Sequence, residues 1–200
     1  MMITRRTAAV MMAATLAGSL QRSPLAADAP VYREFIEGNA AAKVVVIEYA
    51  SLTCHFCADF HTKSFPRLKA DYIDTGKIKF IYRDYPTDGL ATGAALLARC
   101  APGDRGKAMI DMLFKSQHEW AHAEKPLDPL RGYAQLAGMA PADIDACLKN
   151  SAILDEIKAV QKTAGTLYRV QATPTFFVGE AKIEGDNYEA LKQAIDRQLK

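Results

Sequence analysis

The strongest constraint on the fold is an apolar strand pattern that runs directly into a pair of cysteines and then into a helical pattern. Lys43–Ala50 reads KVVVIEYA, a near-continuous apolar run rich in β-branched residues, which is typical of a strand buried on both faces. Cys54 and Cys57 follow, and a helical stretch with a proline inside it continues to about Asp74. Lys77–Pro86 then predicts a second strand. Strand, helix and strand in this order predict a βαβ unit with parallel strands.

The rest of the chain predicts a group of short helices, then a hairpin and a final helix. Residues 88–152 are rich in Ala, Leu and Met, are interrupted by prolines and show no strand pattern, so they predict a helical insertion. Ser151–Tyr168 predicts one longer helix that leads back to the sheet. Val170–Gly179 and Lys182–Glu184 predict a hairpin, and an apolar stripe that begins at Tyr188 predicts the last helix. We therefore expect an α/β fold.

Residues 1–27 have the features of a leader for export. Arg5 and Arg6 precede Ala8–Leu20, an apolar stretch of 13 residues, and a small-residue cleavage site follows near Ala27. Because this stretch is too short to cross a bilayer as a helix, we expect a cleaved signal peptide and a periplasmic protein, rather than a buried N-terminal helix. The adjacent arginines favour the twin-arginine route, with Sec export as the alternative.

The charge balance argues against nucleic acid as a partner. The chain has 25 Lys and Arg against 23 Asp and Glu, and three of the arginines lie within the predicted leader. The remaining sequence is close to neutral and has no basic stripe or block of like charge. Because proteins that bind nucleic acid present such a basic surface, we expect no nucleic-acid partner.

A Cys-x-x-Cys pair can hold haem, zinc or an iron–sulfur cluster, or it can cycle between dithiol and disulfide. A c-type haem requires His directly after the second cysteine, and Ala58 occupies that position. A structural zinc site requires four ligands, but the sequence has no second Cys-x-x-Cys pair, and we expect His61 to be an exposed or helix-capping residue. Cys100 and Cys147 do not have the spacing of iron–sulfur ligands. We therefore expect no metal and no other cofactor.

Redox cycling fits the position of the pair at the start of a helix. Cys54 in the first helical turn faces backbone N–H groups that have no partner within the helix, and the positive end of the helix dipole also favours its thiolate. Cys57 lies on the same face with its Cα about 5 Å away, within the range of a disulfide. We predict that Cys54 is the exposed nucleophile and that Cys57 is the buried resolving thiol. The alternative is a static disulfide, but so short a loop would add little stability.

Together these elements resemble the DsbA family of exported thiol oxidases, which have a thioredoxin fold. The resemblance rests on the strand VVVIEYAS, the helix opening Cys54-His55-Phe56-Cys57, the helical insertion and the segment ATPTFF that leads a late strand. It covers the chain from about Val31 onward. The best-known active site of the family is Cys-Pro-His-Cys, whereas this chain places His first and Phe second.

The resemblance also implies how the chain is divided. It predicts a thioredoxin fold with an inserted α-helical subdomain. Residues 28–87 and 153–200 would form the thioredoxin domain, and residues 88–152 would form the insertion.

The resemblance also implies two structural features outside the Cys54–Cys57 pair. Four cysteines in an oxidising compartment allow three pairings, and the residues alone do not choose between them. The resemblance implies that Cys100 and Cys147 form a second, structural disulfide within the insertion. It also implies a cis bond between Thr173 and Pro174 opposite the cysteine pair, where the backbone of Thr173 would bind a substrate peptide in β-strand fashion.

Three residues near the pair are candidates for further roles. Glu48 matches a buried acid of the family beneath the second cysteine and would relay the proton of Cys57, unless it is a strand end that reaches solvent. His55 is a candidate to interact with the Cys54 thiolate, although it could be an exposed helix-start residue with a minor role. Phe56 is a candidate substrate contact or a simple packing residue.

The sequence thus predicts a monomeric enzyme that oxidises cysteine pairs in reduced, unfolded or partly folded exported proteins. The resemblance implies reoxidation by a membrane quinone reductase of the DsbB type. One alternative is a disulfide reductase or isomerase of the same fold. Another is a periplasmic chaperone in which the cysteines are incidental.

Overall fold

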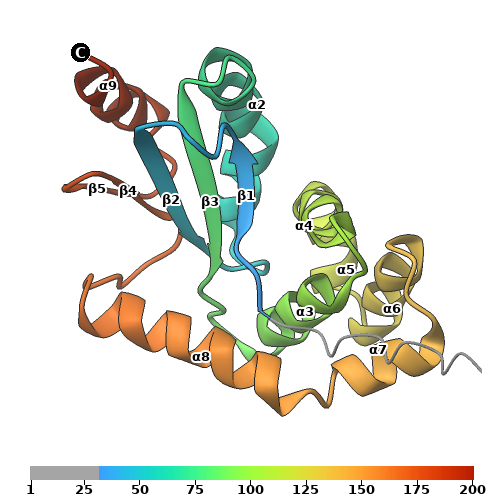
Figure 1. Cartoon of the computed structure of the whole chain (residues 1–200). Helices are drawn as coiled ribbons and strands as arrows, with labels where there is room; N and C mark the ends of the chain where they lie inside the picture. Colours follow the sequence, from blue (N-terminus) through green and yellow to red (C-terminus); the bar gives the residue numbers. More distant parts are fainter. Residues whose placement is uncertain (1–31) are drawn as a thin grey trace, which may run out of the picture.

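The computed structural model describes residues 32–200, and the predicted signal peptide lies outside this range. At its centre is a five-stranded sheet with the order β1-β3-β2-β4-β5 (Figure 1). The central strands β2 (Val44–Ala50) and β3 (Ile78–Asp84) run parallel. Three short antiparallel strands complete the sheet: β1 (Phe35–Gly38), β4 (Thr175–Val178) and β5 (Ala181–Glu184).

The predicted α/β thioredoxin fold with an inserted helical subdomain is confirmed. The strands β2 and β3 form the predicted parallel pair, and β4 and β5 form the predicted hairpin. The edge strand β1 is not predicted by the sequence, because its four residues FIEG alternate between half-buried and exposed positions without a long apolar pattern. This strand depends on its antiparallel pairing with β3, a tertiary contact that local propensity does not reveal.

A single helical segment begins directly after Cys54. It consists of α1 (His55–Asp59), the π-helical turn η1 (Phe60–Ser64), α2 (Phe65–Leu68) and a second π-helical turn η2 (Lys69–Ile73). The predicted interruption at Pro66 falls in the first turn of α2, directly after η1. A wider turn is one way for a helix to continue past a residue that lacks an N–H donor.

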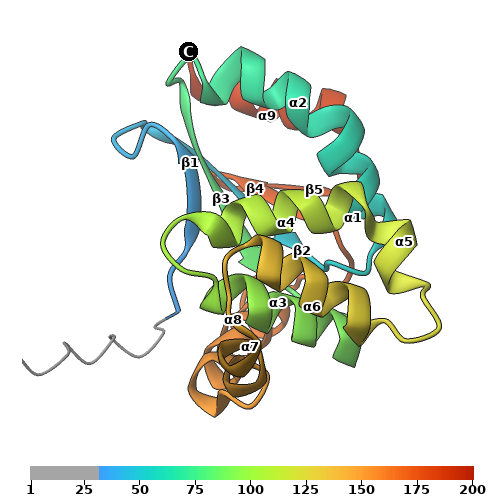
Figure 2. The ribbon, with the colours of Figure 1, turned by 90° about the vertical axis from the view of Figure 1, so that its right-hand side faces the viewer.

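A cluster of short helices lies beside the sheet (Figure 2). It contains α3 (Gly89–Cys100), α4 (Arg105–Lys115), α5 (Gln117–Ala121), α6 (Leu127–Leu136) and α7 (Pro141–Cys147). The long helix α8 (Ser151–Thr166) then leads back below the sheet, and α9 (Tyr188–Gln198) ends the chain (Figure 1). Ala91, Leu97, Met109 and Trp120 are among the fully buried side chains of the cluster, so it has an apolar interior.

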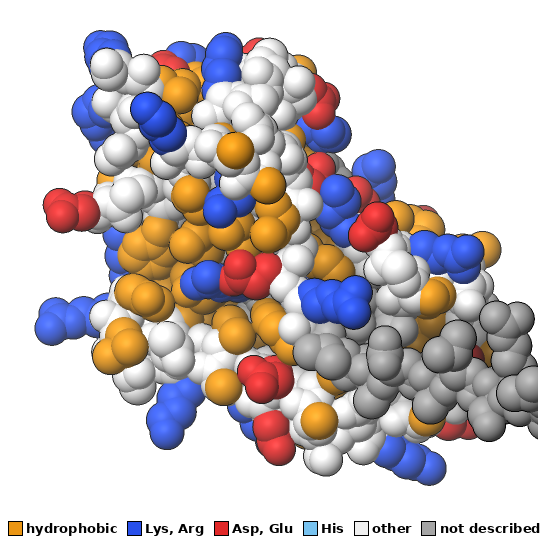
Figure 3. Space-filling model, viewed as in Figure 1, with side chains coloured by type: hydrophobic (Ala, Val, Ile, Leu, Met, Phe, Trp, Pro, Cys, Tyr) orange, Lys and Arg blue, Asp and Glu red, His pale blue; other side chains and the backbone are white. Residues whose placement is uncertain are grey.

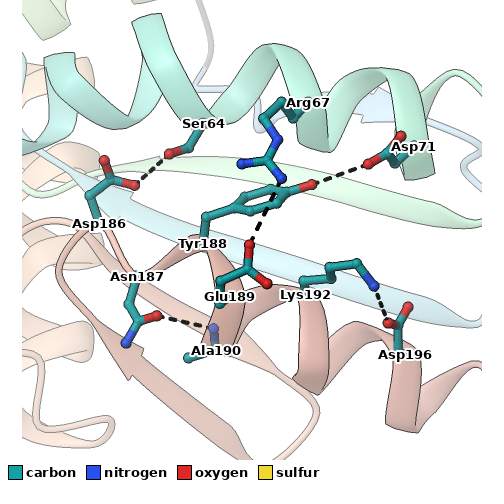
Figure 4. A network of polar contacts seen from close by, with 10 residues as sticks. All are labelled: Ser64, Arg67, Asp71, Asp186, Asn187, Tyr188, Glu189, Ala190, Lys192 and Asp196. Carbon is teal, nitrogen blue, oxygen red and sulfur yellow. Dashed lines mark hydrogen bonds and ion pairs between the residues drawn. The ribbon is translucent and has the colours of Figure 1, made fainter.

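The helical segment after Cys54 and α9 cover the same face of the sheet and are joined by polar contacts (Figure 4). The Ser64 hydroxyl donates to Asp186 at 2.8 Å, and the Tyr188 hydroxyl donates to Asp71 at 3.3 Å. The guanidinium of Arg67 lies 4.3 Å from the centre of the Tyr188 ring. These contacts hold the segment that carries the cysteine pair against the last helix.

The opposite face of the sheet is only partly covered by α8. Figure 3 shows apolar side chains gathered over this face. Ile47 and Phe177 from the sheet and Leu167 and Tyr168 after α8 line a pocket of about 380 Å³ there. Glu48 lies between Ile47 and Tyr49 in β2, so its side chain points to the other face, toward the helical segment.

A buried ion pair joins the sheet to the helical cluster. Arg99 in α3 donates from Nε to Asp84 at the end of β3 at 2.7 Å, and both side chains are 1% exposed. The guanidinium also packs on the rings of Phe35 and Tyr32, at 3.9 Å and 4.3 Å from their centres. Removal of either partner would leave an uncompensated charge in the interior, so this pair fixes the docking of α3.

A disulfide links the ends of α3 and α7. Cys100 and Cys147 are bonded, with their Cα atoms 6.1 Å apart. This is the pairing that the family resemblance implies, and it closes a long loop within the helical cluster. Cys147 is 3% exposed and Cys100 is half-buried, so the link starts in the interior of the cluster and ends nearer its surface.

We expect that replacing both Cys100 and Cys147 with Ala lowers the free energy of unfolding. The two residues are 47 positions apart, and the chain-entropy model gives an upper value of about 4 kcal/mol for a loop of this length. The measurement is urea unfolding at pH 7, in a background where Cys54 and Cys57 are both Ser, so that only this disulfide differs. An unchanged free energy of unfolding would contradict the structural role of the disulfide.

Candidate active site

The cysteine pair lies where β2 ends and the helical segment begins. Cys54 is the N-cap residue of α1, with an extended backbone, and it is half-buried. Cys57 lies one turn on, in α1, and is fully buried. Both are free thiols in this structure. The structure therefore places the two sulfurs in the contrasting environments that the sequence predicts.

The environment of Cys54 favours its thiolate. Its pKa is lowered to about 5, mainly by a hydrogen bond from the Cys57 thiol, while partial burial acts in the opposite direction. The Thr173 side chain and the backbone N–H groups of Phe56 and Cys57 lower the pKa further. The sequence predicts the backbone contribution, but the larger contribution of the Cys57 thiol becomes visible only in the structure.

The environment of Cys57 has the opposite effect. Burial is the main cause that raises the pKa of this thiol well above its ordinary value. The hydrogen bond to Cys54 and the negative charge of Glu48 raise it further. At neutral pH the pair can therefore hold one proton and one negative charge, with the charge on the accessible sulfur.

Thr173 and Pro174 lie opposite the pair, in the loop before β4. The peptide bond between them is cis. The Sγ atom of Cys54 is 3.2 Å from the carbonyl oxygen of Thr173, which can accept a hydrogen bond from the thiol. A hydrogen bond to this acceptor is available only to the protonated form of Cys54. The backbone of Thr173 thus lies within reach of any group bonded to Cys54.

Glu48 and His61 form a buried pair beneath Cys57. Glu48 is fully buried, so it is not a strand end that reaches solvent. His61 is only 8% exposed, and its Nε2 lies 2.8 Å from Oε2 of Glu48. The expectation that His61 is an exposed or helix-capping residue is therefore wrong. His61 follows Cys57 by four residues, which in a helix places both on one face, and that face is turned toward the sheet.

His55 and Phe56 are the exposed residues of the Cys-x-x-Cys segment. Phe56 is 53% exposed, and its ring centre lies 3.9 Å from that of His55. They form a small aromatic surface next to Cys54 in the chain, and the hydrogen bond that the Cys54 thiol donates goes to the Thr173 carbonyl rather than to His55. Phe56 presents apolar surface to solvent next to the half-buried sulfur.

The helical cluster contributes a residue that sequence reasoning does not identify. Gln117 at the start of α5 is buried, and its side-chain NH2 donates to the carbonyl oxygens of Leu52 and Cys54 at 2.8 Å and 2.9 Å. These bonds fix the loop between β2 and α1. A single Gln in a helical region gives no pattern that would point to this contact, since it depends on how the cluster docks.

Two kinds of feature are absent from residues 32–200, the part of the chain that the structure describes. No group of three or more His, Cys, Asp or Glu side chains comes together there in an arrangement that could hold a metal ion. None of the helices in this range combines the length and the apolar character needed to span a bilayer.

We expect alkylation of the reduced protein to show Cys54 half-ionised near pH 5. Replacing Cys57 with Ala removes the strongest donor, so the pKa of Cys54 should rise toward the free-thiol value of about 8.5. The measurement is the rate of alkylation against pH, with mass mapping of the modified cysteine. The same protein in denaturant is the control and should titrate near the free-thiol value. A folded wild-type protein that titrates there too would contradict this account of the site.

Comparison with known proteins agrees with this geometry. Residues 32–197 match the sequence profile of the thioredoxin family. A Rickettsia bellii protein named as a protein-disulfide oxidoreductase is 33% identical over 168 residues, which cover 83% of this chain and 64% of that protein. The chain thus spans less than two thirds of the length of its rickettsial relatives.

Solved structures are similar over most of the chain. The crystal structure of alpha-DsbA1 from Wolbachia pipientis has a TM-score of 0.76 and 28% identity, and the match covers 85% of this chain and 92% of that one. BdbD from Bacillus subtilis, in its oxidised form, has a TM-score of 0.74 at 23% identity and covers 83% of this chain and 92% of its own. The chain belongs to the thioredoxin family, and its structure is similar to that of alpha-DsbA1 from Wolbachia pipientis.

Proposed function

We propose that this protein is an exported thiol:disulfide oxidase that introduces disulfides into other proteins. The observation that carries this proposal is the contrast between the two sulfurs. Cys54 is half-exposed with a pKa lowered to about 5, and Cys57 is buried with a raised pKa. A stabilised thiolate at Cys54 favours the reduced form of the pair, and a pair that favours its reduced form is a strong oxidant of other thiols.

The reaction proceeds by two exchange steps. A substrate thiolate attacks Sγ of Cys54 in the Cys54–Cys57 disulfide, so a bond forms to Cys54 while the electron pair of the broken bond goes to Cys57. The second thiolate of the substrate then attacks the substrate sulfur that is bonded to Cys54, and Cys54 leaves as a thiolate. The substrate loses two electrons to form its disulfide, and the active-site pair gains them.

Substrate binding is assigned to the surface around Cys54. The backbone of Thr173, next to Pro174, lies beside Cys54 and could pair with an extended peptide in β-strand fashion. Phe56 offers exposed apolar surface at the same edge. The proposed substrates are therefore reduced, unfolded or partly folded polypeptides, because these can present an extended backbone and apolar side chains.

The cellular setting extends this proposal. We infer export to the periplasm by a leader at residues 1–27, and reoxidation by a membrane quinone reductase of the DsbB type. The mature protein would be a monomer with a thioredoxin domain at residues 28–87 and 153–200 around an insertion at residues 88–152. The Wolbachia structure, which carries the DsbA name, supports the assignment to this kind of system.

We expect the reduced form of the pair to melt at a higher temperature than the oxidised form at pH 7. The pKa of Cys54 is lower in the folded state, so ionisation stabilises the folded reduced protein fully above the unfolded pKa of about 8.5. This stabilisation is lost as the pH falls through the folded value of about 5. Thermal melts at pH 7 and pH 4.5, with Cys100 and Cys147 both replaced by Ala, measure the difference.

The sign of that difference separates the candidate activities. A reduced form that melts first at pH 7 would contradict the oxidase and favour a reductase of the same fold. A gap of equal size at pH 4.5 would show that the ionisation of Cys54 is not its cause.

We also expect Cys54→Ser to abolish the oxidation of a reduced, unfolded test protein. The serine hydroxyl cannot form the mixed disulfide that both exchange steps require. The measurement is the loss of free thiols in the test protein, and His118→Gln, which changes an exposed residue of α5, is the matched control. A Cys54→Ser protein that still promotes folding of the test protein would instead indicate a chaperone with incidental cysteines.

A further inference from the structure

In the Glu48–His61 pair each partner keeps one buried polar atom without a hydrogen bond, as the Asp84–Arg99 pair also does. Oε1 of Glu48 and Nδ1 of His61 have no partner in the described part of the chain. Both side chains are almost fully shielded from solvent, at 0% and 6% exposed. Buried polar atoms are normally satisfied, so a pair with two spare proton sites suggests a role in moving protons.

The imidazole of His61 is held in place by its neighbours. Its ring stacks on Phe114 of α4, with ring centres 4.1 Å apart and planes 14° from parallel. Tyr82 of β3 approaches edge-on at 6.2 Å. On its own segment, Cys57 lies one turn before it. The ring is therefore fixed between the sheet, the helical segment and the helical cluster, with Glu48 on one side.

A small cavity lies beside His61, and neither cysteine of the pair lines it. It has a volume of about 10 Å³, about the room of one water molecule. The polar residues that line it with His61 are Glu37 of β1, Tyr82 of β3, and Lys107 and Asp111 of α4.

Two of the charged residues that line this cavity are in contact with solvent. The Lys107 side chain is 38% exposed, and its Nζ lies 3.8 Å from Oε2 of Glu37, whose side chain is 12% exposed. Burial raises the pKa of Glu37, and positive charge on Lys107, Lys69 or His61 lowers it. Glu37 is thus an ionisable group near the surface that senses the charge of His61.

Cys57 needs a route for protons to and from solvent in every catalytic cycle. When the Cys54–Cys57 disulfide is reduced, Cys57 takes up a proton, and when the disulfide re-forms, Cys57 must lose it. The thiol is 0% exposed, so bulk water does not reach it. Glu48 is close enough for its charge to raise the pKa of Cys57. Glu48 is itself fully buried, so a further group must connect it to solvent.

We propose that His61 relays protons between Glu48 and the cavity beside Glu37 and Lys107. This inference rests on the proposed function, since it concerns the same cysteine pair. On reoxidation, Cys57 gives its proton to the Glu48 carboxylate as its sulfur attacks Cys54. Glu48 passes the proton to the unprotonated Nε2 of the Nδ1–H tautomer of His61, and the imidazole releases its Nδ1 proton to the cavity and on to solvent, which leaves the Nε2–H tautomer. On reduction, the same proton moves inward along these groups.

The test follows the reaction of the reduced protein with oxidised glutathione. In the first step, the Cys54 thiolate attacks the glutathione disulfide and releases one glutathione thiolate. In the second step, Cys57 loses its proton and attacks Cys54, which releases the second glutathione. Two protein thiols are oxidised and one glutathione disulfide is reduced. Acid quenching and mass measurement give both rates, and only the second step requires the proton of Cys57.

The decisive variant is His61→Gln. The Gln side-chain NH2 can still donate to Glu48, but it does not exchange a proton as imidazole does. We expect formation of the mixed disulfide at the wild-type rate and resolution at pH 7 slower by at least about tenfold, a conservative figure for general acid–base catalysis. Resolution in the variant should also rise steeply with pH, because hydroxide must then remove the proton. His118→Gln is the matched control and should resolve at the wild-type rate.

Two results would overturn the proposal. If His61→Gln resolves the mixed disulfide at the wild-type rate, His61 only positions Glu48. If the variant does not fold, the wild-type protein is measured in D2O. In D2O the rate of resolution of the mixed disulfide should fall, while the rate of its formation should not. An equal change in both rates would exclude the relay. A failure of the proposed oxidase function would be seen in a different measurement. The wild-type Cys54–Cys57 pair would then favour its disulfide form at equilibrium with glutathione, and this result does not depend on how fast the His61→Gln variant reacts.

Discussion

The active site requires two thiols, three positions apart in the chain, to differ in both solvent exposure and protonation. Cys54 must be accessible and charged, while Cys57 must be buried and neutral. A helix that begins at the end of a buried strand meets both demands, because its first turn offers free N–H donors at the rim and its inner face turns to the sheet. The hydrogen bond from Cys57 to Cys54 then couples the two states directly. The remaining elements act to hold this helix start in place.

The helical cluster contributes side chains that contact the active-site region. Gln117 of α5 binds two carbonyl oxygens of the loop that carries Cys54. Phe114 of α4 stacks on His61 beneath the pair. The buried pair of Asp84 and Arg99 ties α3 of the same cluster to the sheet. The internal disulfide links the ends of α3 and α7 within this cluster.

Features that are decided locally could be predicted from the sequence. The apolar pattern of β2 and the cysteine spacing determine the strand, the helix start and the contrast between the two sulfurs. His61 could have been found too, since it lies one turn after Cys57, on a face already predicted to be buried. Gln117 and β1 could not, because their contacts exist only after distant segments have packed. The pairing of Cys100 with Cys147 came from the family resemblance, since the residues alone allow three pairings.

The coupling between the two thiols gives the proton of Cys57 a second role. While Cys57 is protonated, its S–H donates to Cys54 and is the largest cause of the low pKa there. If Cys57 loses this proton, the donor disappears and a second negative charge forms beside the first, so the two thiols titrate as a coupled pair. The group that controls the proton of Cys57 therefore also controls how stable the Cys54 thiolate is. A buried acid beneath Cys57 affects both sulfurs at once, although it contacts neither substrate nor solvent.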